Sequence, residues 1–253
     1  MEISFAGKCV LVTGGTQGIG FAIAQAFLDA GAKVAVNGSS EHSVAKAVAM
    51  LPGRDMVVPA PGSMATVDGC RRAVETALAG LGGMDVLVNN AGIWHATPVA
   101  STEEQTWDSI LDINLKGAFF VTKYALPALR SSKGNIVNIA SVSGIAGEAD
   151  STAYCVSKAG LIQMTRCNAV EFAPDVRVNA VCPGPIDTVM LQRAAEFWSG
   201  TTQEGYRMLS QGTMLKRVGR VAEIAGPVLY LASELANYVT GGVHVVDGGA
   251  TID

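Results

Sequence analysis

Tyr154 and Lys158 are the pair of side chains whose types and spacing best suit acid–base chemistry. They stand four residues apart in Tyr-Cys-Val-Ser-Lys, so on a helix both side chains share one face. A phenol has a pKa of about 10, and a neighbouring ammonium lowers that pKa by stabilising the phenolate. Ser141 ends an apolar, strand-like segment, and a parallel sheet delivers such residues to one crevice. A solvent-exposed Tyr–Lys pair is the alternative, but Ser141 favours a site in which Tyr154 is a general acid or base.

A glycine-rich turn precedes the first predicted helix. Residues Thr13–Gly20 read Thr-Gly-Gly-Thr-Gln-Gly-Ile-Gly and join an apolar segment to an alanine-rich one. Glycines let the backbone turn sharply and approach a pyrophosphate, which then lies at the free N–H groups and positive dipole of the helix N-terminus. A tight turn without a ligand is the alternative. The position between a buried strand and a helix favours a dinucleotide site.

The composition excludes several classes of protein. A chain of 253 residues that is 49% hydrophobic and 16% charged can bury one substantial core, and we expect a single domain over residues 1–253. The net charge is −4 and no run of Lys or Arg occurs, so nucleic acid and anionic membranes are not expected partners. No apolar run approaches the roughly 20 residues of a membrane span.

The cysteines and histidines point to a reducing compartment and to no metal. The five cysteines form no C-x-x-C pair, and their odd number argues against a disulfide framework. The N-terminus lacks the pattern of a secretory signal, so we expect a cytoplasmic protein. We interpret Cys155 as a packed free thiol rather than a reactive one. His42 and His244 belong to no metal-ligating cluster.

Short strand-like segments alternate with longer helical patterns along the chain. Strands are predicted at Lys8–Thr13, Lys33–Asn37, Met56–Pro59, Asp85–Asn89, Asn135–Ala140, Val176–Val181 and Val243–Val246, and helices near 18–30, 41–51, 66–80, 103–130, 152–172 and 221–235. Strand–helix alternation is typical of parallel βαβ units. We therefore predict an α/β fold, a Rossmann-like doubly wound parallel sheet of about seven strands with helices on both faces.

Two places break this pattern. Pro227 falls inside the last predicted helix, where it removes a backbone hydrogen bond and bends the helix unless it lies near the first turn. The interval 188–213 combines a mixed helical pattern with large apolar residues and no strand. Such an interval is typically a lid or binding loop, so we expect a substrate-binding lid there.

Several ordered motifs together resemble the short-chain dehydrogenase/reductase family, in its branch of about 250 residues. These motifs are Thr13–Gly20, Asn89-Asn90-Ala91-Gly92, Asn114 in Ile113–Gly117, Ser141, Tyr154-x-x-x-Lys158, Pro183–Thr188 and the ending Tyr238–Gly249. The resemblance spans nearly the entire chain. It implies an NAD(P)-dependent oxidoreductase.

The resemblance also implies a role for each matching residue. Tyr154 is the general acid/base, Ser141 holds the reacting oxygen of the substrate, and Lys158 lowers the Tyr154 pKa and binds the nicotinamide ribose. Asn114 holds a relay water, or alternatively is a helix-kink residue satisfied by backbone. Trp94 and His95 line the substrate mouth, although a surface position suits His95 equally. The residues implied in cofactor binding are Gly14, Thr16, Gln17, Gly18, Ile19, Gly20, Asn37, Ser39, Ser63, Asn90, Ala91, Gly92, Tyr154, Lys158, Pro183, Gly184, Ile186 and Thr188.

The cofactor choice depends on the end of the second strand. An NAD site places a carboxylate there, whereas this chain has Asn37-Gly38-Ser39-Ser40. NADP enzymes of the family usually add an Arg, and that residue is missing too. Neutral donors on Asn37 and Ser39 can still bind a phosphate, so we favour NADP over NAD, with dual use open. Ser63 stands where the family usually has Asp or Asn against adenine, which leaves that contact in doubt.

The expected reaction is hydride transfer between nicotinamide and a secondary alcohol or ketone of a free small molecule, such as a sugar, a polyol or a steroid-like compound. A 3-oxoacyl-acyl-carrier-protein reductase is the alternative, and a non-catalytic nucleotide-binding protein is the least favoured. Glu148 and Asp150 flank the presumed site mouth and disfavour an acidic carrier protein. They either bind substrate hydroxyls or are solvated carboxylates, and the second interpretation is favoured. We expect a homo-oligomer, a tetramer, while the substrate, stereochemistry and direction stay open.

Overall fold

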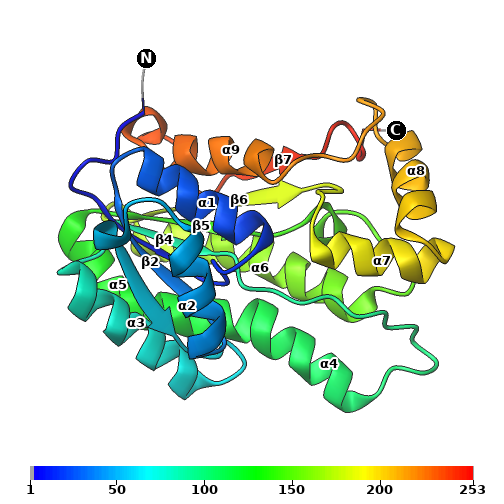
Figure 1. Cartoon of the computed structure of the whole chain (residues 1–253), viewed down its shortest axis with the longest axis horizontal. Coiled ribbons are helices and arrows are strands. Elements are labelled where there is room, and N and C mark those ends of the chain that lie inside the picture. The colour runs from blue at the N-terminus through cyan, green and yellow to red at the C-terminus, as the bar shows by residue number, and fades with distance from the viewer. Residues whose placement is uncertain (1–2, 253) are drawn as a thin grey trace.

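The centre of the molecule is a parallel sheet. The computed structural model describes residues 3–252, and within them seven strands lie in the order β3-β2-β1-β4-β5-β6-β7 (Figure 1). The strands are β1 (Cys9–Val12), β2 (Lys33–Gly38), β3 (Val57–Pro61), β4 (Val86–Asn89), β5 (Asn135–Ile139), β6 (Arg177–Pro183) and β7 (Val243–Val246). The predicted α/β fold with about seven strands is confirmed.

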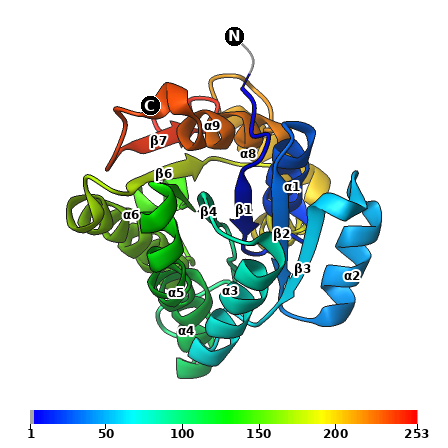
Figure 2. The same ribbon diagram turned by 90° about the vertical axis from the view of Figure 1, so that its left-hand side faces the viewer.

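Helices cover both faces of this sheet. One face packs against α1 (Gly18–Asp29), α2 (Glu41–Met50) and α9 (Ala222–Ala232), and the other against α3 (Val67–Leu81), α5 (Gly117–Ser132) and α6 (Thr152–Phe172). Figure 2 shows the two layers on either side of the sheet. No helix within residues 3–252 is both long and apolar enough to cross a membrane.

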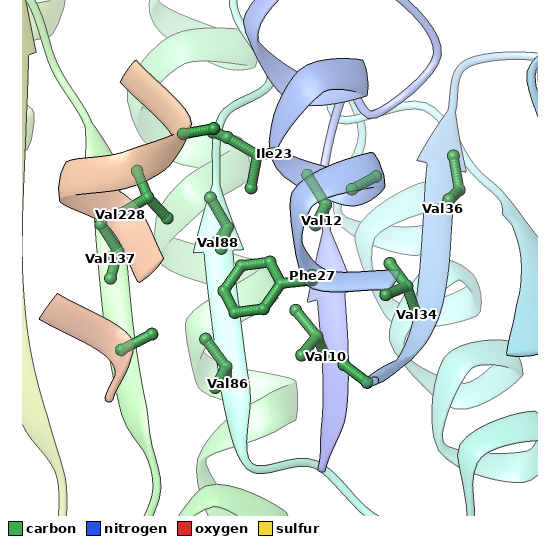
Figure 3. Packing of buried hydrophobic residues seen from close by; sticks show 14 of the residues in the cluster. Val10, Val12, Ile23, Phe27, Val34, Val36, Val86, Val88, Val137 and Val228 are labelled. Atoms are coloured by element: carbon green, nitrogen blue, oxygen red, sulfur yellow. The ribbon is translucent and has the colours of Figure 1, made fainter. Parts of the chain in front are cut away.

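The alternation of side chains along each strand builds two cores. Val10 and Val12 belong to the cluster under α1, whereas Leu11 between them belongs to the opposite cluster. Phe27 of α1 is fully buried over the strands, beside Val86 (Figure 3). Truncating a buried Phe to Ala costs about 3–5 kcal/mol of folding stability. The packing of Phe27 therefore contributes strongly to the attachment of α1 to the sheet.

The strand order reverses beside β1. After β3 the chain returns to pair β4 with the other side of β1, for example Val10 with Val86. The connections that follow β1 and β4 therefore diverge, and a crevice opens at the carboxyl ends of the two strands. Ligands of open α/β sheets bind at such a point.

Some elements differ in detail from their predictions. The predicted helix 103–130 consists of α4 (Glu104–Leu111), a π-helical turn Asp112–Lys116, and α5. The interval 188–213 forms two helices, α7 (Val189–Ser199) and α8 (Thr202–Gly212). Pro227 lies in the middle of α9, beyond its first turn.

Candidate active site

The turn between β1 and α1 forms a cradle of the kind that receives a pyrophosphate. Gly14 and Gly18 have φ values of +60° and +56°, which side chains rarely adopt. A Cβ on Gly20 would overlap the Asn90 amide and the Gly14 carbonyl oxygen. Gln17, the residue before α1, makes no side-chain cap, so no side chain of that residue occupies the first N–H groups of the helix. These features fit a dinucleotide.

The predicted site residues come together around one cavity of about 790 Å³. All the residues predicted above for the cofactor line it, together with Ser141 and Trp94. The cavity runs from the glycine-rich turn to the helices α7 and α8. His95 is exposed and does not line it, and Asn114 lies behind its wall.

Asn37 has a structural role that its sequence position did not reveal. Its side chain accepts a hydrogen bond from the Gly14 N–H at 3.2 Å and donates to the carbonyl oxygens of Ala60 at 2.9 Å and Gly62 at 3.0 Å. Both amide hydrogens are therefore in use, and the Asn37 side chain is not a free phosphate donor. The expectation that it binds a phosphate is corrected, although Ser39 remains exposed at the cavity wall.

Tyr154 and Lys158 lie on α6, one turn apart, beside Ser141 at the end of β5. The Lys158 ammonium is buried, donates to the Ile139 carbonyl oxygen at 2.8 Å and lies 5.7 Å from the centre of the Tyr154 ring. Burial lowers the pKa of Lys158 to about 8. The exposed-pair interpretation is therefore wrong.

The pKa of Tyr154 departs from expectation. Burial raises it to about 12, a hydrogen bond with Ser141 opposes that rise, and the Glu148 charge adds to it. Desolvation of the phenolate is the largest cause of this rise, and the lowering of the Tyr154 pKa by Lys158 stays a prediction. Tyr154 is a protonated phenol at neutral pH, as an ordinary tyrosine also is, and this is the form that donates a proton.

Asn114 occupies the π-helical turn between α4 and α5. Its amide donates to the Ile93 carbonyl oxygen at 3.0 Å and to the Ser157 hydroxyl at 3.0 Å, and its oxygen accepts from the Ile93 N–H at 2.8 Å. π-Helical turns are frequent at functional sites because they redirect one side chain. The turn aims Asn114 at the loop after β4. These contacts match the kink-residue interpretation, and the relay water stays a prediction.

The helices α7 and α8 lie over one end of the cavity. Trp94 packs edge-to-face against Trp198 and Phe197 of α7, with ring centroids 5.5 Å and 6.0 Å apart. Tyr206 of α8 donates to the Asp187 carboxylate at 2.7 Å. Thr188 caps α7 by accepting from the Leu191 N–H, and it also lines the cavity, as predicted.

Sequence reasoning missed Ser143 and Ser151, which hydrogen-bond Glu148 on either side. Their signal was weak, because a serine in a loop is ordinary. Within residues 3–252, Glu148 and Lys158 are the only charged side chains that line the cavity. No group of three potential metal ligands occurs in the same range.

The doubly wound sheet, the glycine cradle at its switch point and the Tyr–Lys–Ser group beside it are the features of a Rossmann-like dinucleotide-binding protein. A family model described as Enoyl-(Acyl carrier protein) reductase matches residues 14–251. The chain is 39% identical to the 3-oxoacyl-(acyl-carrier-protein) reductase FabG of Thermotoga maritima, over 97% of this chain and 98% of the relative. It is 34% identical to the L-fucose dehydrogenase of Bos taurus, over 100% of this chain and 92% of the relative.

Solved structures agree with these relatives. The short-chain dehydrogenase/reductase described as glucose/ribitol dehydrogenase from Brucella melitensis superposes with a TM-score of 0.92 at 32% identity, over 100% of both chains. The aldohexose dehydrogenase of Thermoplasma acidophilum superposes with a TM-score of 0.88 at 33% identity, over 97% of this chain and 94% of that one. The chain belongs to the short-chain dehydrogenase/reductase family, whose members are NAD(P)-dependent oxidoreductases.

Proposed function

We propose that the protein interconverts a secondary alcohol and a ketone on a free small molecule, with Tyr154 as the general acid/base. The observation that carries this proposal is one cavity that joins the glycine cradle to the hydroxyls of Tyr154 and Ser141. The bound nicotinamide cofactor would supply or accept the hydride. The protein contributes alignment and proton transfer.

The protein groups divide this work as follows. Ser141 holds the substrate oxygen by a hydrogen bond, and the protonated Tyr154 phenol donates its proton to that oxygen during reduction. The Lys158 ammonium, fixed by the Ile139 carbonyl oxygen, stabilises the phenolate that remains. The cradle formed by Gly14, Gly18 and Gly20 would hold the cofactor phosphates.

We favour NADP as the cofactor, by a small margin. No carboxylate lines the cavity near Ser39 to repel a 2′-phosphate, and the exposed Ser39 hydroxyl is a donor at that wall. No Arg among residues 3–252 lines the cavity either, which is why dual use of NAD stays open.

A 3-oxoacyl-acyl-carrier-protein reductase is the second candidate. Two relatives that bear this name, from Thermotoga maritima and Aquifex aeolicus, are each 39% identical to the chain. A carrier protein is acidic and needs a basic landing surface. Glu148 at the cavity wall and the exposed Asp150 beside it supply the opposite charge, so we place the free small molecule first.

The test compares wild type with Tyr154→Phe on a panel of free ketones and acyl thioesters with both cofactors. We expect reduction of free ketones, and a loss of about 10²–10⁴-fold in kcat/KM for Tyr154→Phe, with cofactor affinity within a few-fold. Tyr238→Phe is the matched control, because Tyr238 is fully exposed. A Tyr154→Phe variant that keeps more than about a tenth of the activity would contradict the role of Tyr154. Turnover confined to carrier-bound thioesters would favour the second candidate.

A further inference from the structure

Glu148 occupies a singular place at the substrate end of the cavity. It lies in the loop between the short 3-10 helix Val142–Gly144 and α6, and its side chain is half-buried at the cavity wall. It is the one carboxylate among the cavity-lining residues of the described chain. The neighbouring Asp150 is exposed and outside the lining. The two acidic residues of this loop therefore differ sharply in environment.

Two serines hold the Glu148 carboxylate in place. One carboxylate oxygen accepts from the Ser143 hydroxyl at 2.6 Å, and the other accepts from the Ser151 hydroxyl at 3.0 Å. A carboxylate offers about four acceptor directions, so about two remain for a ligand. A solvated surface carboxylate has no such fixed orientation. The expectation that Glu148 is merely solvated does not fit these contacts.

Each serine connects Glu148 to another wall of the site. The Ser141 hydroxyl donates to Ser143 at 3.1 Å, and the Trp94 indole N–H donates to Ser151 at 3.1 Å. The carboxylate is thus two hydrogen bonds away from the hydroxyl expected to hold the reacting oxygen. The carboxylate therefore lies near the reacting centre, where a hydroxyl on the carbon next to the reacting one is the first substrate group that such an acceptor can address.

The remainder of this end of the cavity is mainly apolar. Ile93, Val142, Leu191 and Met208 line it, together with Trp198. A ligand that enters displaces water from Glu148, and an apolar ligand would leave the remaining acceptor directions of that carboxylate unpaired. The site therefore rewards a ligand with a hydrogen-bond donor at this point and penalises one without it.

We propose that Glu148 selects α-hydroxy ketones and the corresponding vicinal diols, by accepting a hydrogen bond from the hydroxyl next to the reacting carbon. This inference rests on the proposed alcohol–ketone function and names the substrate class of the same site. The rest of the preferred substrate is apolar, in keeping with the lining of α7 and α8.

The test uses pairs of ketones that differ in one hydroxyl. Acetoin is compared with its isostere methyl isopropyl ketone, and 2-hydroxyacetophenone with its isostere propiophenone. We expect wild type to prefer the hydroxy ketone of at least one pair by about tenfold or more in kcat/KM, because a site built for a hydroxyl rejects the analogue that lacks it. Glu148→Leu, which removes both acceptor oxygens, should reduce this ratio to within about threefold, and Glu148→Gln, which keeps one acceptor oxygen, should keep part of it.

Asp150→Asn is the matched control, since it removes the same charge from an exposed residue in the same loop. A second readout is the titration of Tyr154, which should move to lower pH in Glu148→Gln and not in Asp150→Asn, because the Glu148 charge raises the Tyr154 pKa. If Glu148 had only a structural role, Glu148→Gln would change the melting curve. A shift of the Tyr154 titration with an unchanged melting curve would therefore show a direct effect of the Glu148 charge.

The possible outcomes separate the two proposals. Equal efficiency within both pairs, or a preference that Glu148→Leu leaves intact, would overturn the inference while the alcohol–ketone function stands. If folded wild-type protein reduced none of the four ketones, this result would contradict both the role of Glu148 and the alcohol–ketone function for these compounds. A preference that Asp150→Asn abolishes equally would assign it to the general charge of the loop and overturn the role of Glu148.

Discussion

At the scale of single residues, the pKa of Tyr154 determines at which pH its side chain is an acid or a base. Burial holds its pKa at about 12 and the Glu148 carboxylate acts in the same direction. A phenol whose pKa is raised keeps its proton as the pH rises past 10, the ordinary value. The protein alone is therefore ready to donate a proton, and a base for alcohol oxidation forms at high pH.

We predict that cofactor-free protein shows no tyrosinate attributable to Tyr154 up to about pH 10. The measurement is the ultraviolet absorbance of tyrosinate in a pH titration, taken as the difference between wild type and Tyr154→Phe. In the same range, kcat/KM for alcohol oxidation should rise with pH. A difference spectrum that titrates near neutral pH would show that Lys158 outweighs burial.

The cofactor preference belongs to the same scale. Asn37→Asp would place a carboxylate against the Ala60 and Gly62 carbonyl oxygens, so it tests stability rather than cofactor choice. Ser39→Asp avoids this problem because Ser39 is exposed. We predict that Ser39→Asp lowers kcat/KM for NADP about tenfold or more relative to NAD, by repelling the 2′-phosphate. Ser39→Asn is the uncharged control, and a wild-type preference for NAD above about tenfold would contradict the assignment.

At the scale of elements, strands and most helices could be predicted because their hydrophobic patterns are local. The strand Val34–Val36 is apolar throughout, and the fold buries it on both faces. Asn37, one residue later, could not be assigned correctly, because its partners Gly14, Ala60 and Gly62 are more than twenty residues away in the sequence, in the glycine-rich turn and in and after β3. The π-helical turn at Asn114 likewise depends on the Ile93 backbone and has no periodic signature.

The interval 188–213, which we predict to be a lid, forms α7 and α8, and one side-chain contact at its start supplies a test of that prediction. Tyr206 donates to Asp187 across the start of the lid. We predict that Tyr206→Phe increases the rate of limited proteolysis within 188–213 by up to about tenfold, since one hydrogen bond contributes about 0.5–1.5 kcal/mol net. Cofactor and product together should slow the cleavage of wild type. Tyr238→Phe is the control, and equal cleavage with and without both ligands would contradict a ligand-ordered lid.

At the scale of the whole molecule, large apolar side chains remain uncovered on two faces. Phe119, Val156 and Val170 are exposed on α5 and α6, and Val245 is exposed on the edge strand β7. Surfaces of this kind mark contacts between proteins, and an edge strand offers unpaired backbone groups. Two separate faces allow closed assembly through two kinds of contact.

We predict a homotetramer, with a mass by light scattering at micromolar concentration about four times the 26.1 kDa of one chain. Val170→Glu should reduce the assembled mass. Val170 is 83% exposed on α6, and a contact between chains on this face would bury the carboxylate of the new Glu side chain. Lys46→Glu on α2 is the control on a different helix. A wild-type mass of a single chain would contradict the prediction.

The strand order also governs how the chain reaches this structure. Every strand pairing that the structure describes is parallel, so no two strands can meet through a short hairpin. The central pairing of β1 with β4 must wait until the long chain segment between them closes into a loop. The conformational entropy of that segment is lost before any contact between the two strands compensates for it. Refolding should consequently be slow. The crevice between β1 and β4 is then among the last features to form, and a bound cofactor would act on the final step of folding rather than on the first.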